Sequence, residues 1–180
     1  MNIYEIADGA PCGLQAREER EKRTYRFLKE LDIPYLRADH DAAFTIGNCD
    51  EIDEKLDVHM CKNLFLCNSQ KTKFYLVMLP GEKKFSSKDF AHKMGIARVS
   101  FAPEEYMEKY LDILPGAVSV MGLMNDKGCN VTLVMDKSVA DGEYIGCHPC
   151  VNTSSLKIKT ADIFEKFLPA TAHEAIILEL

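Results

Sequence analysis

Residues 61–80 read CKNLFLCNSQKTKFYLVMLP, and this stretch decides the fold. It contains two apolar runs, residues 64–67 and 73–79, that are rich in side chains favoured in β-strands. The polar residues 68–72 between the runs are suited to a turn. The stretch therefore predicts an antiparallel β-hairpin.

Upstream of this hairpin the pattern changes to that of a helix. Tyr25, Leu28 and Leu31 recur at a spacing of three within a charged segment, which predicts an amphipathic helix over residues 15–31. Pro34 stops that helix, and residues 33–38 then predict a short strand. Residues 46–56 are acidic and predict a further helix.

Downstream, two helices carry clear boundary signals. Ser86 or Ser87 is suited to cap a helix that ends at Met94, with Gly95 as the residue that follows it. Pro103 suits the first position of a helix that ends at Leu111.

The last third of the chain predicts more strands than helices. The remaining predicted elements are a second apolar hairpin formed by 118–124 and 131–135 across 125–128, a strand at 156–159, a helix at 161–168 capped by Thr160, and a strand at 175–178. Strands and helices mix without a strict βαβ alternation. The order of elements therefore predicts an α+β fold with a mixed or antiparallel central sheet.

Length and composition are those of one globular domain. The chain has 180 residues, of which 47% are hydrophobic and 28% are charged. It contains no apolar run of the ~20 residues that a membrane span needs, and residues 1–17 lack the pattern of a secretory signal. Seven cysteines, an odd number, favour reduced thiols over a disulfide framework. We therefore expect a cytoplasmic protein.

Charge is unevenly distributed along the chain. The net charge is −6 overall, but residues 55–98 carry a net charge of +6, between two segments of −6 each. The basic segment is suited to meet a phosphate backbone. A lysine-rich hairpin with a solvated face explains the same pattern, so charge alone permits a nucleic-acid partner without demonstrating one.

Three features are candidates for chemistry. Cys147-His148-Pro149-Cys150 has the composition of a thiol–disulfide site, but it lies late in the chain and does not open a long helix. The same cysteines and histidines, with His59, Cys61 and Cys67, lack the spacing of a structural zinc site.

Lys62 and a glycine-containing segment are the other two candidates. Lys62 precedes an apolar run, where a lysine is usually a solvated end residue but, held partly buried, can bind a carbonyl or phosphate oxygen. Gly116 and Gly122 flank small and apolar residues and allow close backbone approach to a ligand, although a turn glycine and a bulge explain them equally. The sequence contains no nucleophile elbow, P-loop or dinucleotide fingerprint.

Taken together and in order, these segments resemble the YbaK-like aminoacyl-tRNA deacylases, the family that includes the editing domain of bacterial prolyl-tRNA synthetase. The chain is most similar to the free-standing ProXp-ala type, which clears alanine from proline tRNA. The segments that carry the resemblance are CKNLFL at 61–66, YLVMLP at 75–80, RVSFA at 98–102, LPGAVSVMGLMND at 114–126, and CHP at 147–149 with Asn152.

The resemblance implies a fold and a reaction. The fold is a single YbaK-like domain over residues 1–180, with a mixed, partly barrel-like central sheet flanked by helices and with residues 1–15 as a candidate N-terminal extension. The reaction is hydrolysis of the ester between an amino acid and the terminal ribose of tRNA(Pro), most simply Ala-tRNA(Pro). The implied partner is the acceptor end of that tRNA, with prolyl-tRNA synthetase as a second candidate. No metal, organic cofactor, membrane or DNA is implied.

The resemblance also implies roles for individual residues. Lys62 matches the lysine that polarises the substrate end, while His148 and Asn152 match the family's histidine and downstream asparagine. The resemblance places the remaining candidates in substrate binding, and these are Asn63, Gly116, Ala117, Val120, Met121, Gly122, Pro149 and Ser155. Relatives commonly carry proline and an aromatic residue where this chain has Val120 and Met121. The amino acid that the pocket accepts therefore need not be alanine alone.

Two alternatives from other classes remain at this point. The first is a non-catalytic protein that senses an amino acid or a charged tRNA on the same fold. The second is a thiol oxidoreductase at Cys147 and Cys150, which requires a low thiol pKa.

Overall fold

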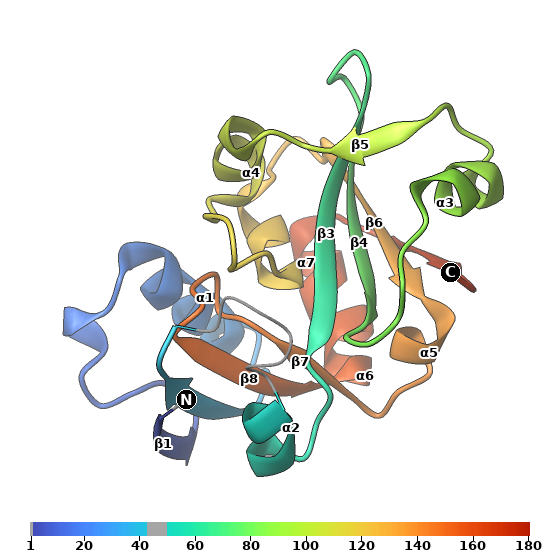
Figure 1. The fold of residues 1–180 in the computed structure, drawn as a ribbon. Helices are drawn as coiled ribbons and strands as arrows, with labels where there is room; N and C mark the ends of the chain where they lie inside the picture. Colours follow the sequence, from blue (N-terminus) through green and yellow to red (C-terminus); the bar gives the residue numbers. More distant parts are fainter. Residues whose placement is uncertain (1, 43–49) are drawn as a thin grey trace.

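The computed structural model describes residues 2–42 and 50–180 (Figure 1). Within them the strands are β1 Ile3–Asp8, β2 Tyr35–His40, β3 Cys61–Asn68, β4 Phe74–Pro80, β5 Val99–Phe101, β6 Val131–Asp136, β7 Tyr144–Cys147, β8 Ser154–Lys159 and β9 Ala175–Leu178. The helices are α1 Glu19–Glu30, α2 Asp50–Leu56, α3 Ser87–Met94, α4 Glu104–Leu111, α5 Lys137–Ala140, α6 Thr160–Asp162 and α7 Leu168–Thr171. Two 3₁₀ turns, Leu14–Ala16 and Val120–Asn125, and a π-helical turn, Ile163–Phe167, complete the described elements.

The strands form two sheets, and the predicted hairpin is the centre of the larger one. β3 and β4 pair antiparallel, with Leu64 opposite Val77. β6 then pairs parallel with β4, and β9 pairs parallel with β6, so this sheet is mixed, in the order β5-β3-β4-β6-β9. The other sheet, β1-β2-β8-β7, is antiparallel throughout. The predicted α+β class and the mixed sheet are confirmed.

The best-defined helix boundaries are confirmed as well. The hydroxyl of Ser86 accepts a hydrogen bond from the Asp89 amide, and Gly95 adopts the left-handed conformation that ends α3. At α4, Leu111 is the last helical residue as predicted, whereas Pro103, predicted as the first, lies one residue before the helix begins at Glu104. α1 begins at Glu19, four residues after the predicted start, because residues 14–16 form a separate 3₁₀ turn.

The predicted second hairpin is wrong. Residues 120–125 form a 3₁₀ helix, and Ser119 caps it by accepting a hydrogen bond from the Met121 amide. β6, the other half of the predicted pair, instead lies parallel to β4. The Asp126 carboxylate accepts a hydrogen bond from the Val131 amide at 2.7 Å. This bond closes the turn 126–130 that leads into β6.

Other elements differ in extent. β1, within the predicted extension 1–15, pairs antiparallel with β2. The helix predicted from Ala161 begins one residue earlier, and Lys159 occupies the capping position that was expected for Thr160. Of the helix predicted over 46–56, residues 50–56 form α2, and the start of that prediction lies outside the described residues.

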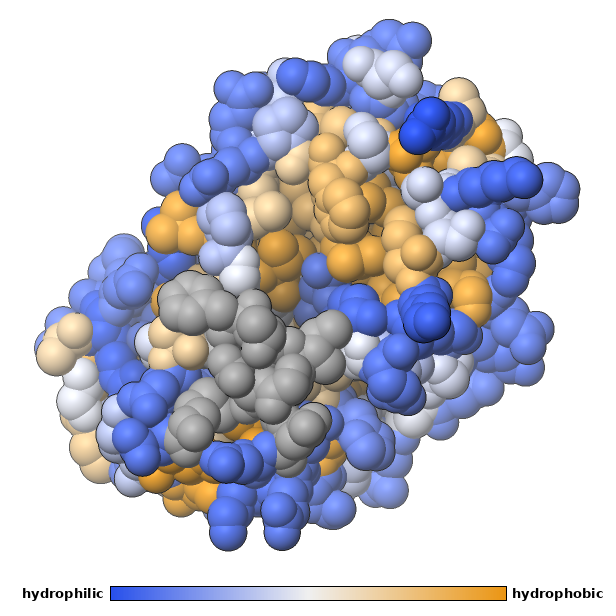
Figure 2. Space-filling model, viewed as in Figure 1, coloured by the Kyte–Doolittle hydropathy of each residue, from blue (hydrophilic) through white to orange (hydrophobic). Residues whose placement is uncertain are grey.

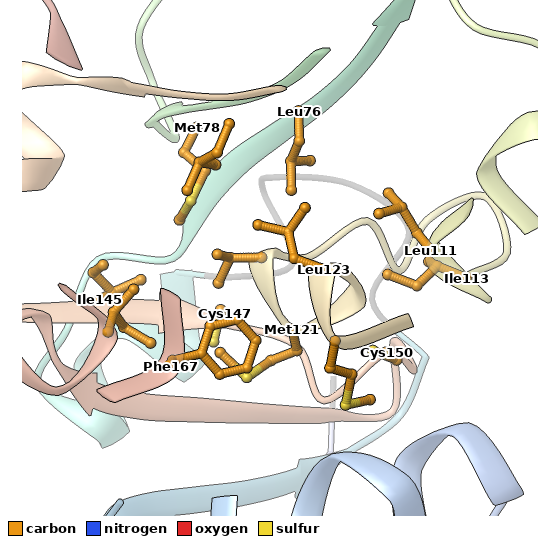
Figure 3. Packing of buried hydrophobic residues seen from close by; sticks show 14 of the residues in the cluster. Leu76, Met78, Leu111, Ile113, Met121, Leu123, Ile145, Cys147, Cys150 and Phe167 are labelled. Carbon is orange, nitrogen blue, oxygen red and sulfur yellow. The ribbon is translucent and has the colours of Figure 1, made fainter. Parts of the chain in front are cut away.

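The core lies on both faces of the β3–β4 hairpin. One face packs Phe65, Leu76 and Met78 against the 3₁₀ helix 120–125 and the C-terminal helical segment (Figure 3). The other face packs Leu66 and Val77 against α3. This two-sided burial explains why β4 is apolar at nearly every position.

Two surface properties complete the description. Figure 2 shows apolar surface gathered over the region of the five-stranded sheet, with polar side chains around it, and Phe101 on the edge strand β5 is 68% exposed. Within the residues that the structure describes, no helix is both long and apolar enough to cross a membrane.

Candidate active site

The two sheets meet where β3 begins and β7 ends, and a cavity opens at this junction. An isolated parallel bridge joins Met60 to Gly146. The bridge brings Lys62, at the start of β3, and His148, just after β7, to the same cavity of about 730 Å³. Its other lining residues include Asp53, His59, Cys61 and Glu82. A cavity of this size is in the range of those that bind small ligands.

Lys62 is held at the cavity by the chain that follows β4. Its Nζ donates a hydrogen bond to the Lys83 carbonyl at 2.7 Å. Because an ammonium group has three hydrogens, two are left unused by residues 2–42 and 50–180 and can bind a molecule in the cavity. The Lys83 side chain donates in turn to the buried Asp136 carboxylate at 2.8 Å. Burial alone raises the pKa of Asp136, but hydrogen bonds from Lys83 and Ser138 lower it to about 2, so Asp136 stays ionised and anchors this turn.

His148 lines the cavity, and the surroundings of its ring determine which nitrogen carries a hydrogen. Its Nδ1 lies 2.9 Å from the Ser154 carbonyl oxygen. A carbonyl can only accept, so Nδ1 carries the hydrogen. Burial lowers the pKa of His148 to about 4, against a smaller opposing effect of that hydrogen bond, so the ring is neutral near pH 7. Nε2 therefore keeps its lone pair and is a hydrogen-bond acceptor for a ligand.

The turn that carries His148 is fixed from two sides. The hydroxyl of Ser119 donates to the His148 carbonyl at 2.6 Å, which ties the turn to the 3₁₀ helix 120–125. The hydroxyl of Thr24 on α1 shares its hydrogen between the Arg20 carbonyl at 3.1 Å and the carbonyl of the buried Pro149 at 3.3 Å. Cys150 then adopts a positive φ of 64° and reverses the chain toward β8.

The other predicted polar residues are not among those that line the cavity. Asn152 is half-buried in the turn between β7 and β8. Ser155 is fully buried at the start of β8, where its hydroxyl lies 3.4 Å from Nδ1 of His148 and 2.9 Å from Nε2 of His40. Asn63 follows Lys62 in β3 and so points to the opposite face of the strand, where its Nδ2 donates to the Cys61 carbonyl.

The glycine-containing segment has another location. Gly116 lies in an exposed turn with a φ of 87°, while Ala117, Val120 and Met121 belong to the main core (Figure 3). A Cβ on Gly122 would lie 2.6 Å from the Ile113 Cδ1 atom and 2.9 Å from the Leu111 Cβ atom. Gly122 thus permits close packing of the 3₁₀ helix. The cavity beside Lys62 is not lined by these residues.

The cysteines lack the properties of a redox site. Cys147 and Cys150 are at most 1% exposed. Burial raises the pKa of both thiols, that of Cys150 to about 12, whereas a reactive thiol needs a lowered pKa. Over residues 2–42 and 50–180, no three His, Cys, Asp or Glu side chains come together as ligands of a metal ion would.

Two buried residues beside His148 were not singled out from the sequence. His40, at the end of β2, is 2% exposed, and its ring lies 6.3 Å from that of His148. Ser119 was missed because a serine within an apolar run has no distinctive spacing. A histidine between two aspartates, 39 and 41, was the only available signal for His40, and it does not indicate a site by itself.

Comparison with known proteins identifies the family. The model of the aminoacyl-tRNA editing domain matches residues 40–166. The chain belongs to the aminoacyl-tRNA editing domain family. The matched range of this editing domain includes both Lys62 and His148.

Relatives of this editing domain match over most of their length. The prolyl-tRNA editing protein ProX of Acetoanaerobium sticklandii is 33% identical over 153 residues, which is 85% of this chain and 93% of that protein. The prolyl-tRNA synthetase associated domain-containing protein 1 of Danio rerio is 28% identical, over 98% of this chain and 94% of the relative.

Solved structures show the same fold. A crystal structure of a candidate trans-editing enzyme for prolyl-tRNA synthetase superposes with a TM-score of 0.67 at 11% identity, over 92% of this chain and 99% of that one. The editing-domain fold is thus retained at a sequence identity too low to carry a functional argument.

Proposed function

We propose that the protein is a trans-editing hydrolase that removes a wrongly attached small amino acid, most simply alanine, from tRNA(Pro). The observation that carries this proposal is the meeting of Lys62 and His148 in one cavity at the junction of the two sheets. A fixed ammonium group and a neutral imidazole acceptor are a suitable pair for hydrolysing an ester. The choice of tRNA is supported by the names of two relatives, of which one refers to prolyl-tRNA editing and the other to prolyl-tRNA synthetase.

The chemistry follows from these two groups. A water molecule attacks the ester carbonyl, and the two free N–H bonds of Lys62 stabilise the negative charge that develops on the carbonyl oxygen. Nε2 of His148 accepts a hydrogen bond from the attacking water or from the neighbouring ribose hydroxyl. The bond from the acyl carbon to the ribose oxygen then breaks, that oxygen takes the proton that the attacking water gives up, and the products are free amino acid and uncharged tRNA.

Editing of alanine is physically reasonable. A synthetase pocket built for proline cannot strongly exclude a smaller side chain, because a missing methylene costs only ~1–3 kcal/mol of binding. A second site that admits alanine and rejects proline on size completes a double sieve. The exposed lysines of the basic segment, such as Lys71 and Lys73, are candidates to contact the phosphates of the acceptor stem.

The proposal is tested by hydrolysis of alanyl-, seryl-, cysteinyl- and prolyl-tRNA(Pro) by the purified protein. We expect rapid loss of alanine, with the prolyl ester spared by its larger side chain. Loss of serine or cysteine in place of alanine would keep the reaction and change the substrate. Binding of charged tRNA without turnover of any ester would contradict the proposal and favour a sensing protein.

The pH dependence of hydrolysis provides a separate prediction. His148 acts in its neutral form, and burial lowers its pKa to about 4. The activity is therefore expected to be present above that pKa and to fall about tenfold per pH unit below it. The measurement is kcat/KM between pH 3 and pH 8, with circular dichroism at each pH to verify that the fold persists. An acidic limb near 6.5, the value of a solvated histidine, would contradict the assigned environment of His148.

A further inference from the structure

A hydrogen-bonded chain connects His148 to a second buried histidine. It runs from the Asp41 carbonyl through His40 and Ser155 to His148, and its members come from β2, β8 and the turn after β7. β2 and β8 are adjacent antiparallel strands, with Ala38 opposite Ser155. The chain is thus built into the pairing of the antiparallel sheet.

The direction of every hydrogen bond in this chain follows from its two ends. Nδ1 of His40 lies 2.7 Å from the Asp41 carbonyl oxygen, which can only accept, so this nitrogen carries a hydrogen. Burial lowers the pKa of His40, against the opposing charges of Asp39 and Asp41, so the ring is neutral and Nε2 has a lone pair. The Ser155 hydroxyl must therefore donate its single hydrogen to Nε2 of His40, at 2.9 Å.

The consequence for His148 lies at the oxygen of Ser155. With its hydrogen directed to His40, Oγ can offer only lone pairs to Nδ1 of His148, 3.4 Å away. This favours the tautomer with the hydrogen on Nδ1, the same one that the Ser154 carbonyl selects at 2.9 Å. Without His40, the hydroxyl is free to rotate and donate to Nδ1, in competition with the Ser154 carbonyl, which would raise the share of the tautomer with the hydrogen on Nε2 and so reduce the share of His148 that can accept a hydrogen bond there.

We propose that His40 is a positioning residue that acts through Ser155 to hold His148 in the tautomer whose Nε2 accepts a hydrogen bond in the cavity. The catalytic consequence rests on the proposed deacylase function, whereas the tautomer itself does not. In this hydrogen-bonded chain Ser155, predicted from the sequence to bind substrate, instead orients His148. It is fully buried and does not line the cavity.

The first test measures the tautomer directly. Nitrogen NMR of the histidine side chains distinguishes protonated from unprotonated ring nitrogens, and replacing His148 with glutamine assigns its signals. We expect a bare Nε2 on His148 in the unaltered protein and a larger share of hydrogen on Nε2 in His40→Ala. His40→Gln is expected to restore the original state, because its amide oxygen reaches the position of Nε2 and can accept from Ser155. An unchanged tautomer in His40→Ala would overturn the proposal.

The second test measures turnover of the accepted aminoacyl-tRNA. His40→Ala is expected to lower kcat by roughly 10- to 100-fold, as removal of outer hydrogen-bond partners of a functional histidine does in metal sites, with little change in KM. His40→Gln should recover most of the loss, and the exposed His92→Ala serves as the matched control. A kcat equal to that of the unaltered protein in His40→Ala would overturn the catalytic role.

A double variant at His40 and Ser155 distinguishes an action through the hydrogen-bonded chain from a general structural effect of His40→Ala. Because His40 acts on the tautomer through the Ser155 hydroxyl, adding His40→Ala to Ser155→Ala should change the turnover little further. If the double variant instead loses turnover by the product of the two single losses, His40 does not act through Ser155. If the tautomer shifts as expected but the unaltered protein hydrolyses no ester, the positioning role stands and the deacylase proposal fails.

Discussion

Replacing Lys62 with alanine is expected to lower the rate of ester hydrolysis by about 10²–10³-fold, the loss seen when one donor to a developing oxyanion is removed. Lys62 lines the cavity shared with His148, and its Nζ uses one of its three hydrogens in contacts with the residues that the structure describes. The loss should appear mainly in kcat, because the charge that Lys62 stabilises is largest in the transition state. The measurement is single-turnover hydrolysis of the accepted aminoacyl-tRNA.

Two further variants separate charge from packing. Lys62→Met keeps the length and apolar stem of the side chain but removes the ammonium, so we expect it to be as inactive as Lys62→Ala. Lys29→Ala, an exposed lysine on α1 outside the basic segment, serves as the matched control and should retain activity. Hydrolysis at the unaltered rate by a folded Lys62→Met protein would remove Lys62 from the mechanism.

The parts of the fold predicted correctly are those specified by neighbouring residues. The β3–β4 hairpin depends on two apolar runs and the turn between them. α3 depends on its serine cap, Ser86, and on Gly95, which follows its last residue. These signals involve residues close together in the sequence, so they can be recognised without knowing how the strands pair in the sheet.

The predicted second hairpin failed because its two halves interact with distant partners. The apolar residues 118–124 pack as a 3₁₀ helix into the core, where Gly122 allows contact with Leu111 and Ile113. β6 gains its hydrogen bonds from β4 and β9 in parallel. A polar, glycine-containing stretch such as 125–128 can terminate either structure, so local composition could not distinguish them.

In the candidate site, too, the sequence indicates individual residues but not the long-range contacts that bring them together. Lys62 and His148 were found through a resemblance, but their shared cavity depends on the long-range bridge between Met60 and Gly146. His40 belongs to a hydrogen-bonded chain that spans two strands and a turn, and strand pairing of β2 with β8 is what brings it there. No spacing along the sequence encodes that contact.

The bridge at Gly146 leads to the prediction with the largest expected effect on stability. A Cβ at this position would lie 2.7 Å from the His59 carbonyl oxygen and 2.9 Å from the Met60 Cα atom. Both are backbone atoms of the bridged segment, so they can move away only if the bridge opens. Gly146→Ala is expected to lower the free energy of unfolding by about 1–3 kcal/mol, the usual cost of overpacking. Urea denaturation measures this loss.

The same substitution should also lower activity, because opening the bridge moves β3, which carries Lys62, away from the turn that carries His148. Gly13→Ala is the matched control, since a Cβ there meets no atom within 4 Å and its φ of −89° is allowed for alanine. A Gly146→Ala protein with unchanged stability and turnover would show that the junction tolerates separation. A stable but inactive protein would show that the distance between the two groups matters more than the packing that sets it.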